Sequence, residues 1–181
     1  LRLAFLKSAR GKRGKREVGA YAARLDENLL LLREQLLDRS ADVGHYHFFT
    51  VHDPKERLIC AAAFPERVLH HAIMNVCEPV LERYAIHDSY ACRAGKGMHA
   101  AVRRAQGFAA RFPWHLKLDV RKYFDSIAHD RLTALLARRI KDADVLRLFA
   151  EIVGTYRTEP GRGLPIGNLV SQHLANFYLG H

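Results

Sequence analysis

Apolar and charged residues alternate along residues 114–121, which read WHLKLDVR. Leucine or valine occupies positions 116, 118 and 120, and a charged residue occupies positions 117, 119 and 121. This period of two predicts a β-strand that carries Asp119 near its carboxyl end. A carboxylate on a buried strand is costly unless a cation neutralises it. Asp119 therefore belongs either to a metal-and-phosphate site or to an ion pair with Lys117 or Arg121.

Helical periodicity flanks a second strand-like region. Leucines at 25, 29, 32 and 36 predict a helix over residues 18–39. Residues 45–63 are rich in aromatic and β-branched side chains around a turn at 52–56, which predicts a β-hairpin with Lys55 and Arg57 near its tip. A charged hairpin tip is either simply solvated or faces an anionic ligand.

The next helix is predicted to open at Pro65 and Glu66, because proline is favoured in a first turn. Pro79 should begin a second helical piece, since proline lacks the amide that a helix interior needs. Gly95-Lys96-Gly97 then forms a loop before a helix that carries Arg103 and Arg104. This loop suits either a phosphate or no ligand at all, and it lacks the spacing of a P-loop.

Two amphipathic helices and a bend follow the alternating segment. Asp130 is expected to cap a helix that starts at Arg131, and Asp142 a second helix. Pro165 and Gly167 predict a bend before a helix over residues 168–179.

Composition points to a polyanionic partner. The 181 residues carry a formal net charge of +10, and 49% of them are hydrophobic, so a basic surface accompanies a real core. Residues 1–17 are basic and broken by glycines, which fits a flexible arm on phosphates or a solvated tail. No run of about 18 uncharged apolar residues is present, so we expect no membrane partner. Three cysteines without metal-ligand spacing indicate reduced thiols in a cytoplasmic protein and argue against zinc.

Four blocks of sequence, in this order, resemble those of a reverse transcriptase. They cover residues 48–181 and read RLICAAAFPERVLHHAIMNVCEPVLE, DSYACRAGKGMHAA, LKLDVRKYFDSIAHDRL and GLPIGNLVSQHLANFYL. The resemblance implies an α+β, right-hand polymerase fold with fingers and a partial palm but no thumb. It also implies RNA-directed DNA synthesis from a template RNA, a primer or cDNA and dNTPs.

The same resemblance assigns roles to individual residues. It makes Asp119 the catalytic carboxylate and, with the carbonyl of Val120, a ligand of two Mg2+ ions. Phe124 becomes the gate that excludes a 2′-hydroxyl, and Asp125 a turn residue. The implied nucleotide-binding residues are Arg57, Arg67, Lys122, Tyr123, Phe124, Ile166 and Gly167, and the implied nucleic-acid-binding residues are Arg93, Lys96, Arg103 and Arg104.

The last block departs from the common family pattern at Ile166 and Gln172, where most relatives have glutamine and proline. This variant resembles the enzymes of diversity-generating retroelements, which misincorporate opposite adenines and act with a structured RNA and a small basic accessory protein. An apolar side chain in place of the glutamine removes a polar constraint on the incoming nucleotide, and loosened base discrimination would follow.

The family's second acidic motif, Tyr-x-Asp-Asp, does not occur, and one carboxylate does not hold two magnesium ions. We therefore expect a fragment that is inactive alone. The expected parts are a basic extension (1–24), fingers (25–113), a palm strand (114–128), a helical segment (129–163) and a truncated palm helix (164–181). The alternatives are a faithful retron or group II intron-type enzyme, a catalytically silent RNA-binding relative, and a basic helical adaptor unrelated to polymerases.

Overall fold

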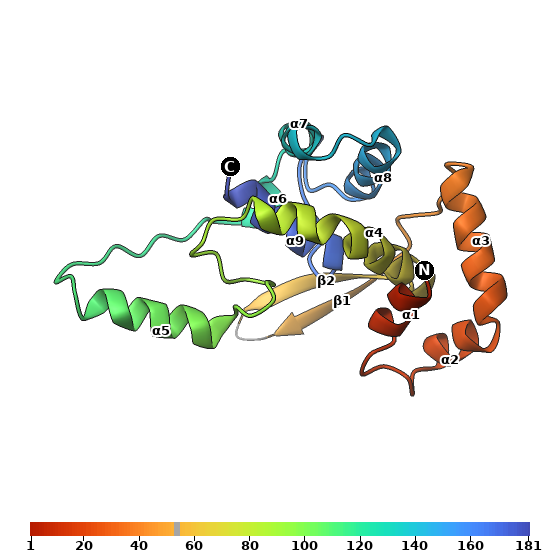
Figure 1. Cartoon of the computed structure of the whole chain (residues 1–181), viewed down its shortest axis with the longest axis horizontal. Helices are drawn as coiled ribbons and strands as arrows, with labels where there is room; N and C mark the ends of the chain where they lie inside the picture. The colour runs from red at the N-terminus through yellow and green to blue at the C-terminus, as the bar shows by residue number, and fades with distance from the viewer. Residues whose placement is uncertain (53–54) are drawn as a thin grey trace.

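The computed structural model describes residues 1–52 and 55–181 of the chain (Figure 1). Within these residues, the chain forms helices and a single two-stranded antiparallel sheet, whose strand β1 is largely exposed. The elements are α1 (Arg2–Ser8), α2 (Arg16–Ala23), α3 (Leu25–Leu37), β1 (Tyr46–His52), β2 (Glu56–Ala62), α4 (Phe64–Arg83), α5 (Met98–Ala109), α6 (Tyr123–Ser126), α7 (His129–Arg139), α8 (Ala143–Gly154) and α9 (Leu169–Leu179).

Helix α4 is the centre of the hydrophobic core. Helices α1, α2 and α9 all pack against it. At its start, the ring of Phe64 meets the rings of Phe5 and Tyr21 edge-on, with centroids 6.2 and 5.3 Å apart. Aromatic side chains bury large apolar areas, so this cluster contributes strongly to the stability of the core.

The prediction that Pro79 begins a separate helical piece is wrong, because α4 runs through it to Arg83. Proline removes one backbone hydrogen bond from the helix. Cys77 and Leu81, on either side of Pro79, are both buried in the core. Packing on both sides of the proline therefore holds the helix together across the missing bond.

The predicted hairpin is confirmed. Strands β1 and β2 pair antiparallel with Phe48 opposite Cys60 and Val51 opposite Arg57. The predicted turn includes residues 53 and 54, which lie outside the described residues. Lys55 and Arg57 do lie at and beside the end of the hairpin.

Two predictions for the N-terminal region need correction. The predicted helix over residues 18–39 is divided at Arg24, where the side chain of Asn28 donates to the carbonyl of Tyr21 at 3.0 Å. Residues 2–8 are neither a flexible arm nor a solvated tail, because α1 buries Ala4 and Phe5 against α4.

The strand predicted over residues 114–120 is not formed. The segment is extended but exposed, with Leu116 82% and Leu118 81% accessible to solvent. A strand needs a hydrogen-bonded neighbour, and no strand of the described chain lies beside this one. Figure 1 shows α5 and this segment projecting together from the body, and we call residues 98–121 the arm.

The C-terminal helices follow their predicted capping only in part. Asp142 caps α8 by accepting from the amides of Asp144 and Val145. Helix α7 begins at His129 rather than at Arg131, so Asp130 lies inside its first turn. Among the described helices, none combines the length and the apolar character that crossing a bilayer would require.

Candidate functional site

A hollow of about 360 Å3 brings together most of the residues predicted to contact a nucleotide. It gathers residues from the hairpin, the turn at 121–126 and the bend before α9. Its walls are Arg57, Lys122, Tyr123, Phe124, Asp125 and Ile166. Three separate blocks of the sequence therefore meet at one place.

The floor of the hollow is the short turn that ends in α6. Lys122 adopts a left-handed backbone conformation, with φ 50° and ψ 46°, and α6 follows at once. Such a conformation is uncommon for a side chain other than glycine and requires support from its surroundings. The carbonyl of Lys122 accepts from the amide of Ser126 at 3.1 Å, which closes the turn.

Tyr123 anchors this turn to α9. Its hydroxyl donates to the carbonyl of Ala175 at 2.6 Å, and burial raises its pKa to about 12. Its ring also meets that of Phe124 edge-on, with centroids 6.0 Å apart. Tyr123 is thus held by the core, and it holds the ring of Phe124 in turn.

The backbone on the far side of the turn is tied to residues 158–164. The amide of Leu164 donates to the carbonyl of Phe124 at 3.0 Å, and the amide of Gly163 donates to the carbonyl of Ile127 at 2.9 Å. Thr158 donates through its hydroxyl to the carbonyl of Asp125. These bonds fix the backbone over residues 124–127, which carries the half-buried ring of Phe124.

The bend at Ile166 and Gly167 is bonded directly to β2. The amide of Cys60 donates to the carbonyl of Ile166 at 2.7 Å, and the amide of Ala62 donates to the side chain of Asn168 at 3.3 Å. Gly167 has φ +111°, and a Cβ placed there would lie 2.7 Å from the side chain of Ile59. Glycine is therefore required for the bend to approach the strand and present Ile166 to the hollow.

Arg57 supplies positive charge at the mouth of the hollow. It is exposed on β2, and no ion pair joins it to any residue that the structure describes. A guanidinium in this position suits the phosphates of a nucleotide, because its fork of donors matches two anionic oxygens. Arg67 does not share this site. It pairs with Glu17 on α2 and lies over the ring of Phe64.

Asp119 and Val120 lie on the exposed arm and do not line the hollow. Neither predicted ion pair of Asp119, to Lys117 or to Arg121, occurs among the described contacts. Over residues 1–52 and 55–181, no group of three potential metal-binding side chains comes together. These residues alone do not fit a magnesium centre, because Mg2+ requires several oxygen ligands in octahedral geometry.

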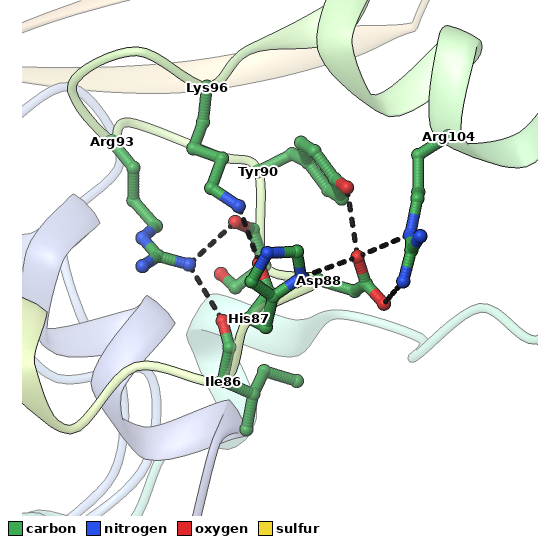
Figure 2. A network of polar contacts seen from close by, with 8 residues as sticks. Ile86, His87, Asp88, Tyr90, Arg93, Lys96 and Arg104 are labelled. Atoms are coloured by element: carbon green, nitrogen blue, oxygen red, sulfur yellow. Dashed lines mark hydrogen bonds and ion pairs between the residues drawn. The ribbon is translucent and has the colours of Figure 1, made fainter.

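Three of the four residues predicted to contact nucleic acid hold the loop between α4 and α5 (Figure 2). The side chain of Arg93 is only 10% exposed. It donates to Glu82 at 2.7 Å and to the carbonyls of Ile86 and Ser89 at 2.7 and 2.8 Å. Lys96 donates to the carbonyl of His87 at 2.7 Å.

Arg104 joins this loop to α5. Its guanidinium pairs with both carboxylate oxygens of Asp88, at 3.0 and 3.2 Å, and Tyr90 donates to the same carboxylate. The Arg104 guanidinium, helped by Tyr90, holds the pKa of Asp88 well below its usual range. Arg103 is exposed on α5 and takes no part in the network.

Sequence patterns did not reveal the acidic partners of these arginines. Glu82 and Asp88 stand 11 and 16 residues from the arginines they bind, so no local spacing marks them. Gln172 was noted as a departure from the family pattern. Its side chain accepts a weak hydrogen bond from the thiol of Cys92, at 3.5 Å, and so ties α9 to the same loop.

The chain is similar to several curated proteins at low identity, although no family model matches it. It is 29% identical over 153 residues to the uncharacterized 91 kDa protein in cob intron of Schizosaccharomyces pombe, covering 81% of this chain and 18% of that protein. It is 26% identical over 161 residues to the mitochondrial nuclear intron maturase 2 of Arabidopsis thaliana, covering 77% of this chain and 22% of that protein. The chain is thus similar, at low identity, to a protein named as an intron maturase.

A third relative is Protein YkfC of Escherichia coli, 27% identical over 175 residues that cover 87% of this chain and 45% of that protein. The chain thus spans less than half the length of the curated relatives it matches. Relatives named for introns support a connection with intron maturases. None of their names points to a diversity-generating retroelement.

Proposed function

We propose that this chain supplies the nucleotide-facing and template-facing part of a reverse transcriptase with a right-hand polymerase fold. One observation carries the proposal. Arg57, Phe124 and Ile166 come from three blocks that each resemble a reverse transcriptase, and they line the same hollow. Unrelated blocks would have no reason to converge in this way.

The three side chains offer a nucleotide different surfaces. The guanidinium of Arg57 can pair with the triphosphate, since charge-assisted hydrogen bonds to phosphate are stronger than neutral ones. The ring of Phe124 gives a flat apolar wall that can pack against a deoxyribose and crowd a 2′-hydroxyl. Ile166 adds a second apolar wall beside it.

We propose Asp119 as a ligand of a magnesium site that requires further carboxylates. The described residues do not assemble a magnesium site. The function that we propose for the hollow itself is nucleotide binding.

The relatives named as maturases favour an RNA partner for this chain. Its net charge of +10 agrees, because neutralised phosphates contribute much of the affinity for RNA. A small basic accessory protein would be repelled by so basic a chain unless RNA lay between them. We therefore include template RNA in the proposal and leave an accessory protein out.

The observations favour neither error-prone nor faithful copying. Ile166 lines the hollow, as the resemblance to diversity-generating enzymes requires. However, the relatives named for introns fit an intron-type enzyme equally well.

The test is binding of dGTP to the 181-residue chain, measured by calorimetry at low salt beside deoxyguanosine. Arg57→Gln should weaken dGTP binding about tenfold or more, because it removes a charged hydrogen bond to phosphate. It should leave binding of deoxyguanosine unchanged. Arg33→Gln, at an exposed arginine of α3, is the matched control. Equal dGTP affinity in the parent and in Arg57→Gln would contradict the proposal, and so would no dGTP binding at all.

A further inference from the structure

The arm carries aromatic rings that the core does not bury. Helix α5 has no buried residue along its length. Phe108, Phe112 and Trp114 line an open hollow of about 610 Å3 between α5 and the segment that follows it. We call these three residues the aromatic platform. A hollow of this volume falls within the range of ordinary ligand sites.

Trp114 is the most exposed member of the platform, with 89% of its surface accessible. Phe112 is 56% exposed, and its ring lies 6.3 Å from that of Phe108, tilted by 36°. A cluster of solvent-exposed apolar side chains often marks an interaction surface.

Arginines accompany the rings. The guanidinium of Arg104 lies over the ring of Phe108 at 4.4 Å, and that of Arg111 lies near the ring of Phe112 at 5.9 Å. Arg103 is exposed one residue before Arg104 on the same helix. The platform thus combines flat rings with positive charge.

The free charge of the arm is mostly positive. Residues 98–121 contain five lysines and arginines and a single acidic residue, Asp119. Of these five, Arg104 pairs with Asp88, and no ion pair joins the other four to any residue that the structure describes. An apolar protein partner would need only the rings. A single-stranded nucleic acid needs both features, because its bases stack on aromatic rings while its phosphates take up the positive charge.

We propose that the aromatic platform binds single-stranded RNA, with unpaired bases stacked on Trp114 and Phe112 and with Arg103 and Arg111 facing the phosphates. This inference rests on the proposed function, since it assigns a surface to the RNA partner. It is independent of the nucleotide hollow, because none of the platform residues lines that hollow.

The chain provides its own probe, because Trp114 is its single tryptophan. A 12-residue oligouridylate added to the 181-residue chain should change the emission of Trp114 on binding. The same RNA annealed to oligoadenylate should change it less, since paired bases are not free to stack. Bases that stack on aromatic residues lose substantial affinity when the ring is removed. Trp114→Ala should therefore bind fluorescently labelled oligouridylate about tenfold more weakly.

Leu37→Ala provides the matched control, because Leu37 is a 66% exposed apolar residue on α3. Its affinity for the RNA should equal that of the parent. Circular dichroism should show the same helix content in both variants, since neither side chain is buried.

The outcomes separate this inference from the proposed function. Tight RNA binding that Trp114→Ala does not weaken would overturn the platform and leave the RNA partner in place. Absence of RNA binding at any salt concentration would overturn both. A chain that sediments as a dimer, and becomes monomeric in Trp114→Ala, would show instead that the platform is a contact between protein copies.

Discussion

Helices α4 and α5 have similar origins in the sequence and opposite fates in the structure. Each repeats apolar residues at helical spacing. Helix α4 buries nine of its residues, whereas α5 buries none. An amphipathic pattern therefore predicts that a helix has a face to cover. It does not say whether the covering partner is another part of the same fold.

The difference also separates stability from binding. The contacts of α4 with α1, α2 and α9 hold the body together. The arm adds little to that core, so its side chains remain available to a ligand. Substitutions of the same kind in the body and in the arm should therefore have different consequences.

The largest expected contrast is between two phenylalanines. Phe64→Ala should lower the free energy of unfolding by about 3–5 kcal/mol, because removal of the ring leaves a cavity beside the rings of Phe5 and Tyr21. Phe112→Ala, in the arm, should change it by less than about 0.5 kcal/mol. Urea denaturation followed by circular dichroism measures both values. Equal losses would mean that the arm is packed in solution.

Two glycines should respond in opposite directions. Gly167→Ala should cost about 1–3 kcal/mol, because it combines a left-handed backbone with a clash against Ile59. Gly107→Ala, inside α5, should gain about 0.5–1 kcal/mol, because its Cβ would meet no other atom and alanine favours a helix. Thermal unfolding of the two variants beside the parent gives the sign. A stabilising Gly167→Ala would show that the bend is not held against β2.

The smallest expected effect concerns pH. Burial, together with the charges of Lys7 and Lys12, lowers the pKa of His71. The unfolded chain therefore takes up a proton near pH 6.5 that the folded chain resists, and stability should fall as the pH drops below that value.

Because His71 is only partly buried, the effect should be a few tenths of a kcal/mol for each pH unit. His71→Asn should flatten the fall between pH 6.5 and 5, as seen in urea midpoints. Burial also lowers the pKa of His173, so some of the fall should remain. His115→Asn, at an exposed position of the arm, should leave the fall unchanged. A parent chain equally stable at pH 5 and pH 7 would contradict the assignment.

Local patterns in the sequence were sufficient to predict elements whose stabilising contacts join residues close together in the chain. The hairpin is an example, since its strand residues and turn are adjacent in the chain. The cap of α8 is another, because Asp142 bonds amides two and three residues away. Such interactions leave a signal within a short window.

Interactions over longer distances left no such signal. The continuation of α4 through Pro79 depends on packing against α1 and α9, which no local rule includes. The ion pairs of Arg93 and Arg104 depend on Glu82 and Asp88, which neither the resemblance nor any local spacing indicated. The strand predicted around Asp119 is absent for a related reason, since alternation predicts a strand but does not provide its neighbour.

The nucleotide hollow is an intermediate case. Resemblance to a family selected Arg57, Phe124 and Ile166 from distant blocks, and the structure brings them together. Arg67 was selected by the same reasoning, but it lies against α2. Resemblance thus selected residues that meet at the hollow, together with one residue that packs elsewhere.

The hydrogen bonds between the bend and β2 have a consequence for the solubility of the protein. A strand at the margin of a sheet offers unpaired amides and carbonyls to any extended chain that meets it. Residues 166–168 occupy two of these amides on β2, at Cys60 and Ala62. The segment that carries Ile166 therefore both lines the hollow and covers part of the edge of β2. A ligand that pushed this wall aside would open the edge to aggregation, which sets a limit on how far the hollow can widen.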